Sequence, residues 1–220
     1  MDFRNAKELL KVCQEQGLSI SAVMLQRELT EGEQDPEETD RKMDRVLEIM
    51  KSAASTPIHT PVKSMGGLIG GEAKKISDHK DAGKGLCGDL LERAVIYAMA
   101  TLETNASMGV IVASPTAGSA GIVPGLLLAL QETYDLSDEQ IKQGLYNASA
   151  IGYLAMRNAT VAGAVGGCQA EVGIASAMAA SATVELMGGS PEQSLAAAST
   201  VLMNMLGLVC DPVGGLVEYP

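Results

Sequence analysis

The apolar positions in the first quarter of the chain follow helical spacing. Asp35 has the side chain of an N-cap, Pro36 suits the first helical turn, and acidic residues follow at once. The apolar residues behind them recur at positions i, i+3, i+4 and i+7 and are Met43, Val46, Leu47 and Met50. The pattern predicts a helix that ends before Thr56-Pro57, because a proline disfavours helical backbone at the residue before it.

A second amphipathic helix is predicted for GDLLERAVIYAMATLE, residues 88–103. One apolar stripe would be formed by Leu90, Leu91, Ala94, Val95, Ala98, Met99 and Leu102. Small residues dominate after this helix. Two capping boxes, SDEQ at 137 and SPEQ at 190, mark later helix starts.

The segment CQAEVGIASAMAASATVELMGG, residues 168–189, has small residues on all sides of the helix expected there, which is typical of a central helix surrounded by others. No stretch alternates as a strand would. The sequence therefore predicts an all-α fold, a single helical bundle-like catalytic domain with glycine-rich loops. A change in character near residue 60 divides amphipathic helices in 1–60, packing on the core, from a helical core in 61–220.

Composition and charge exclude several classes of protein. Aromatic residues make up only 3% of the chain, so a core of small aliphatic side chains and methionine is expected. The net charge of −11 opposes binding to nucleic acid or to an anionic membrane surface. Uncharged stretches at 104–131 and 193–210 contain many polar or proline residues, so we expect buried helices and no membrane span. The N-terminus shows no apolar leader, and four cysteines form no C-x-x-C pair, which together favour a reducing cytoplasm.

Two cysteines lie in glycine-rich frames, Cys168 in GAVGGCQAEVG and Cys210 in GLVCDPVGG. If Gly166-Gly167 turn the chain into a helix, Cys168 lies at a helix N-terminus, where N–H groups and the helix dipole favour the thiolate that iron requires. The alternative is that both cysteines only pack in a core of small residues.

Two loops are candidate binding elements. The segment ASPTAGSAGIVPG, residues 113–125, offers hydroxyls and free N–H groups ahead of a helix, which suits a carboxylate or phosphate. An ordinary turn between buried helices is the alternative. The second loop has four glycines whose backbone can approach a ligand closely, and it lacks the G-x-G-x-x-G spacing of a dinucleotide site. They are Gly66, Gly67, Gly70 and Gly71.

These segments together resemble a known family. MGGLIGGEAKK, NASMGVIVASPTAGSAGIVPG, GAVGGCQAEVG and LGLVCDPVGGLVEYP are similar, in this order over about residues 15–220, to the alpha chain of bacterial iron–sulfur-dependent L-serine dehydratases. The resemblance implies an all-helical fold and conversion of L-serine to pyruvate and ammonia. It also implies a [4Fe–4S] cluster held by three cysteines, with one iron open as a Lewis acid, and no pyridoxal phosphate.

Cys168 and Cys210 match two of the family's ligand positions. The third position follows the GLVE-x-P segment, so we expect it beyond Pro220 and expect this chain to be truncated before it. Cys13 and Cys87 match no ligand position.

The remaining expectations concern substrate, base and partners. Ser114, Thr116, Gly118 and Ser119 are expected to bind the substrate carboxylate, with the glycine loop closing nearby, and Lys74 is a candidate base. The resemblance implies a beta subunit or fused beta domain and a homo- or hetero-oligomer. Two alternatives stay open: a related hydro-lyase acting on another hydroxy acid such as threonine, and a non-catalytic helical subunit.

Overall fold

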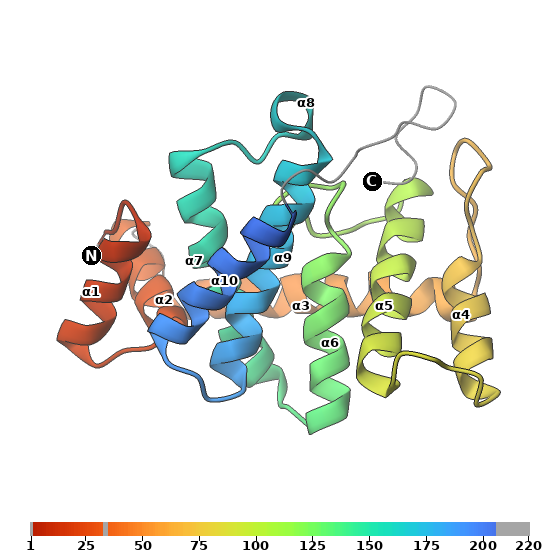
Figure 1. The fold of residues 1–220 in the computed structure, drawn as a ribbon, viewed down its shortest axis with the longest axis horizontal. Coiled ribbons are helices and arrows are strands. Elements are labelled where there is room, and N and C mark those ends of the chain that lie inside the picture. Colours follow the sequence, from red (N-terminus) through yellow and green to blue (C-terminus); the bar gives the residue numbers. More distant parts are fainter. Residues whose placement is uncertain (1, 33–34, 206–220) are drawn as a thin grey trace.

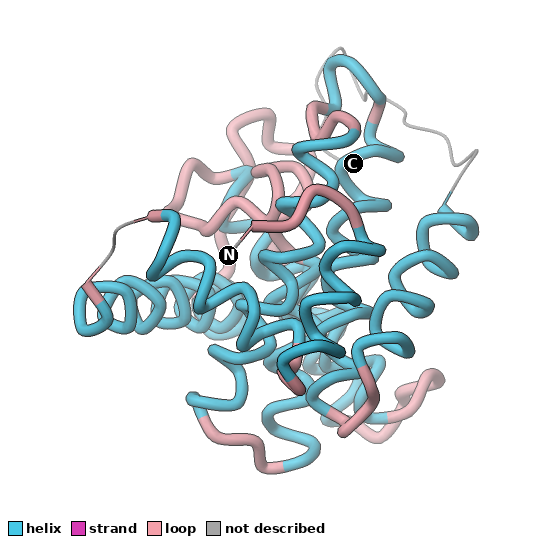
Figure 2. Tube along the Cα trace, turned by 90° about the vertical axis from the view of Figure 1, so that its left-hand side faces the viewer, coloured by secondary structure: helices cyan, strands magenta, loops and turns pink. Residues whose placement is uncertain are grey.

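The computed structural model describes residues 2–32 and 35–205, and within these residues every regular element is a helix. The first half contains α1 (Ala6–Gln16), α2 (Ile20–Glu31), α3 (Pro36–His59), α4 (Glu72–Asp81) and α5 (Asp89–Ala106). The second half contains α6 (Ile122–Tyr134), α7 (Asp138–Asn158), α8 (Gly163–Gly166), α9 (Cys168–Leu186) and α10 (Pro191–Met205). The predicted all-α fold is confirmed, as Figures 1 and 2 show.

The long helix α3 crosses behind the helices of the second half, and α9 lies among α6, α7 and α10 (Figure 1). The main core joins α3, α6, α7 and α9 through residues such as Leu47, Leu127, Ile151 and Ala177. A smaller core packs α1 and α2 against α7 around Phe3 and Ile20. The central position predicted for the helix at Cys168 is confirmed. The division of the chain at residue 60 stays a prediction.

Local sequence signals explain most helix starts. Asp35 caps α3 by accepting from the N–H of Glu38, and Ser137 forms a capping box with Gln140 at α7. The second box also forms, because Ser190 and Gln193 exchange backbone-to-side-chain bonds of 2.8 and 3.3 Å at the start of α10. None of the helices in the described part has the length and apolarity needed to cross a bilayer.

The predicted end of α3 is wrong. The helix continues through Pro57 to His59. Pro57 has no N–H for the carbonyl of Ala53, four residues earlier, but the hydroxyl of Thr104 on α5 donates to that oxygen over 2.9 Å. A tertiary contact therefore replaces the bond that proline removes, and the helix persists.

The apolar stripe predicted for α5 is wrong in part. Leu91 and Val95 are 53% and 41% exposed, whereas Ile96 and Ala100 are buried. The face toward α6 is made of small residues: a Cβ added to Gly125 would lie 2.9 Å from the carbonyl oxygen of Ala94. Close backbone approach, rather than burial of large side chains, thus joins α5 to α6.

Candidate functional site

Three connections that carry predicted site residues lie at one end of the bundle, the upper edge of Figure 1. They are the α3–α4 loop, the α5–α6 loop and the segment from α7 through α8 to α9. Because this end of the bundle brings together predicted site residues that are far apart in the sequence, it is the candidate site.

Cys168 is the first residue of α9, as the sequence predicts. Gly167 precedes it with φ 76° and ψ 172°, a backbone conformation that favours glycine. The Cys168 side chain is buried, and it lies where the first N–H groups of a long helix concentrate positive potential. This setting suits a sulfur ligand that carries negative charge.

Cys210 lies outside the described residues. Within 2–32 and 35–205 no group of three His, Cys, Asp or Glu side chains is close enough to hold a metal ion. Of the other two cysteines, Cys13 is buried between α1 and α2 and Cys87 is exposed before α5. The described part therefore contributes Cys168 alone to the predicted cluster site.

Hydroxyl groups brace the α5–α6 loop from within. Ser119 is 2% exposed, and its Oγ donates to the carbonyl of Ser114 over 3.3 Å and lies 3.2 Å from Oγ1 of the half-buried Thr116. Within the described part of the chain, the backbone N–H groups from 116 to 119 donate to no protein acceptor. These N–H groups precede α6, so the loop keeps donors for an anion while its serines fix its shape.

A cavity of about 330 Å³ lies beneath this loop. Its walls come from α3, α6, α7, α9 and residues 112–115, and they are largely apolar, with Met43, Met50 and Met178 among them. Ser114 also lines the cavity, and its buried Oγ has no hydrogen-bond partner among the described residues.

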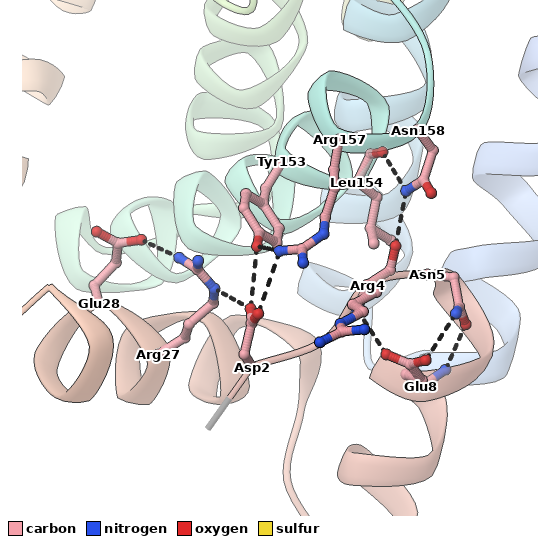
Figure 3. A network of polar contacts seen from close by, with 10 residues as sticks. All are labelled: Asp2, Arg4, Asn5, Glu8, Arg27, Glu28, Tyr153, Leu154, Arg157 and Asn158. Atoms are coloured by element: carbon pink, nitrogen blue, oxygen red, sulfur yellow. Dashed lines mark hydrogen bonds and ion pairs between the residues drawn. The ribbon is translucent and has the colours of Figure 1, made fainter.

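The N-terminal arm is joined to α7, which forms one wall of this cavity, by the polar network of Figure 3. Tyr153, a lining residue, donates to Oδ1 of Asp2 over 3.1 Å and hydrogen-bonds with Arg157. The guanidinium of Arg27 lies 4.0 Å from the centre of the same ring and donates to Asp2 over 3.0 Å. Phe3 packs edge-on against Tyr153 with ring centres 5.4 Å apart. These contacts fix the C-terminal half of α7, which leads into α8 and Cys168.

Glu171 joins the cysteine to the α5–α6 loop. It lies in the first turn of α9, and its Oε1 accepts from the N–H of Gly163 over 3.2 Å. A Cβ added to Gly118 would lie 2.6 Å from Oε2, and one added to Gly163 would lie 2.7 Å from the carboxyl carbon. A side chain at either position would displace the carboxylate from this space.

Glu171 was not predicted from the sequence as a site residue. The signal was present, since GGCQAE places a lone carboxylate one helical turn after the cysteine in an uncharged stretch. The missing information was the contact with Gly118, which only the tertiary fold supplies.

The glycine loop lies on the α4 side of α5 (Figure 1). Gly67, Gly70 and Gly71 have φ of 72°, 145° and 91°, and Gly66 precedes them at an exposed position. The N–H of Met65 donates to the carbonyl of Ala106, which ties the loop to the end of α5 where the α5–α6 loop begins. Proximity of the glycines to a bound substrate stays a prediction.

Lys74, the candidate base, lies in α4. Its Nζ pairs with the carboxylate of Asp78 at 2.8 and 2.9 Å, and its side chain is 41% exposed. The buried Glu103 of α5 fixes the start of the same helix by accepting from the N–H of Ala73 over 2.8 Å. The role of Lys74 as a base stays a prediction.

Fold and site together define a class: an all-helical protein, within the part described, with a buried cysteine at the start of its central helix and, nearby, a loop whose N–H groups from 116 to 119 donate to no described acceptor. The chain belongs to the serine dehydratase alpha chain family, whose family model matches residues 15–220.

Named relatives agree with this assignment. The chain is 49% identical over 218 residues to the probable L-serine dehydratase, alpha chain, of Bacillus subtilis, covering 99% of this chain and 72% of that protein. It is 44% identical over 218 residues to the L-serine dehydratase, alpha chain, of Peptoniphilus asaccharolyticus, covering 99% and 75%. It is 39% identical over 224 residues to the L-serine dehydratase of Streptomyces coelicolor, covering 99% of this chain and 48% of that protein.

Proposed function

We propose that this chain is the alpha component of an L-serine dehydratase, a lyase that converts L-serine to pyruvate and ammonia. The relatives named for this activity support the reaction, since the match extends over 99% of the chain. The observation that carries the proposal is the contact of Glu171 with Gly118, which unites the cysteine turn and the anion-binding loop in one site.

The cofactor is proposed as a [4Fe–4S] cluster. Cys168 fits this group, because a sulfur at a helix N-terminus is favoured as a thiolate and thiolates are the ligands of such clusters. Cys210 and a third cysteine beyond Pro220 would complete the ligand set. When bound, the cluster would supply a Lewis acid for the departing hydroxyl group.

The chain's own residues would bind and orient the substrate. The N–H groups from 116 to 119 and the hydroxyl of Thr116 would donate hydrogen bonds to the serine carboxylate. The hydrogen bond from Ser119 to the carbonyl of Ser114 stabilises the conformation of the loop. A general base removes the α-proton as water leaves, and Lys74 is retained as the candidate from the sequence. The resulting aminoacrylate tautomerises to an imine, and water hydrolyses the imine to pyruvate and ammonia.

A beta component is proposed to cover this end of the bundle. The loops that carry the site also carry large apolar side chains exposed to solvent, and a partner chain would cover such side chains. Their exposed fractions are 79% for Met65, 75% for Met108, 70% for Val110 and 79% for Val165. The oligomer is therefore proposed to bury the loops around the substrate.

The test is turnover by the full-length alpha chain assembled anaerobically with its beta component. We expect pyruvate to form from L-serine at a higher kcat/KM than the keto acid that forms from L-threonine. A preference for L-threonine would assign the related hydro-lyase reaction instead. No keto acid from either substrate, in protein that carries iron and sulfide, would contradict the proposal.

A further inference from the structure

Within the described part of the chain, one oxygen of the Glu171 carboxylate accepts a hydrogen bond and the other accepts none. Oε1 accepts from the N–H of Gly163, whereas Oε2 lies beside Gly118, 2.6 Å from where a Cβ on that residue would stand, and receives no donor in the described part of the chain. We infer that Oε2 accepts a hydrogen bond from the α-ammonium group of the substrate, so that Glu171 selects α-amino acids over hydroxy acids without an amino group. This inference rests on the proposed function.

Charge complementarity supports this role. An α-amino acid presents an anion and a cation on the same carbon, so a site for it needs donors beside an acidic group. The α5–α6 loop supplies donors, but no charged residue occurs between Glu103 and Glu132. The negative charge must come from another element, and α9 brings Glu171 against Gly118 in this loop. A charge-assisted bond in a half-buried site is stronger than a bond between neutral groups.

Two other carboxylates show why Glu171 differs from a structural cap. Glu185, also on α9, uses both oxygens within the protein, accepting from Ile20, Ser21 and Asn147. Glu103 is 1% exposed, so a ligand cannot reach its carboxylate. Glu171 is half-buried, and its second oxygen faces the loop proposed for the substrate carboxylate.

The informative variant is Glu171→Gln. An amide oxygen still accepts from the N–H of Gly163, so the local backbone contact is kept while the charge is removed. Glu171→Asp keeps the charge on a shorter side chain and tests partial rescue. Glu185→Gln is the matched control, because it removes a carboxylate from the same helix at its opposite end.

The experiment measures the KM for L-serine and the inhibition constant of β-hydroxypropionate, which is serine without its amino group, in the assembled holoenzyme. In Glu171→Gln we expect the KM for L-serine to rise about tenfold or more, and the inhibition constant of β-hydroxypropionate to change less than about twofold. Glu171→Asp should recover part of the KM, and Glu185→Gln should alter neither constant.

Equal weakening of both ligands by Glu171→Gln would overturn the inference and leave Glu171 as a residue that only positions the loop. A lower kcat at unchanged KM would also overturn it. Both results leave the proposed function intact, which fails separately if the wild-type holoenzyme forms no pyruvate from L-serine.

Discussion

The hydroxyl of Thr104 on α5 donates a 2.9 Å hydrogen bond to the carbonyl oxygen of Ala53 on α3. This carbonyl is the one that Pro57 leaves without its helical donor, because proline has no N–H. The bond therefore stabilises an otherwise unfavourable proline inside a helix, and it joins α3 to the helix that leads into the α5–α6 loop.

Thr104→Val should lower the free energy of unfolding by about 1–2 kcal/mol, since it leaves a buried carbonyl unsatisfied. The same substitution in a Pro57→Ala background should cost less, because the restored N–H at position 57 can donate to Ala53. A double-mutant cycle by urea unfolding measures this coupling. Strict additivity of the two substitutions would contradict this explanation of the uninterrupted helix.

Close packing of α5 on α6 gives a second prediction. Gly125→Ala should destabilise the fold by about 1–3 kcal/mol, because the added methyl would lie 2.9 Å from the Ala94 carbonyl oxygen and backbone cannot move aside easily. Gly173→Ala is the matched control, since its nearest neighbour, Cβ of Met205, is 3.5 Å away and alanine favours helix. Thermal unfolding of both variants tests this; equal melting temperatures would contradict it.

The stability at alkaline pH should depend on Cys13. Burial, and then the nearby carboxylates of Glu185 and Glu192, raise the pKa of this thiol from 9.0 to about 11. Because the folded state holds the proton more tightly, the stabilisation is full below pH 9 and is lost as the pH rises from 9 to 11.

Cys13→Ala should therefore lose less stability than the wild type between these pH values, by an amount on the order of 2 kcal/mol. Urea unfolding across the pH series measures the difference. Cys87→Ala, at an exposed position, should follow the wild-type slope. A Cys13→Ala curve parallel to the wild type would show that Cys13 is not the group responsible.

We expect two hydroxyls of the α5–α6 loop to have different roles, Thr116 in substrate binding and Ser119 also in stability. Thr116→Val should raise the KM for L-serine several-fold with little change in unfolding, because Thr116 is half-buried at the loop surface. Ser119→Val should lower the thermal stability as well, since Ser119 is 2% exposed and braces the loop internally. Unchanged KM in both variants would remove this loop from the substrate site.

The sequence predicted those features that local chemistry controls. Asp35 and Ser137 cap their helices as expected, and Gly167 turns the chain so that Cys168 begins α9. The continuation of α3 through Pro57 could not be predicted, because it depends on a hydroxyl from another helix. The exposed face of α5 was misassigned for a similar reason: small residues, not the larger Leu91 and Val95, contact α6.

The candidate site divides in the same way. The sequence indicated Cys168 and the serine-rich loop separately, each from its own neighbours. Glu171 was missed because its significance lies in the space between Gly118 and Gly163, and such a contact across the fold leaves no periodic pattern.

The central claim is that Cys168 holds an iron–sulfur cluster at the start of α9. The most direct measurement is the iron and acid-labile sulfide content of the full-length alpha chain after anaerobic reconstitution, for the wild type, Cys168→Ser and the exposed control Cys87→Ser. We expect iron and sulfide in the wild type and in Cys87→Ser, and their loss in Cys168→Ser with the helical fold retained by circular dichroism. Full iron and sulfide in Cys168→Ser, or none in the wild type, would contradict the claim.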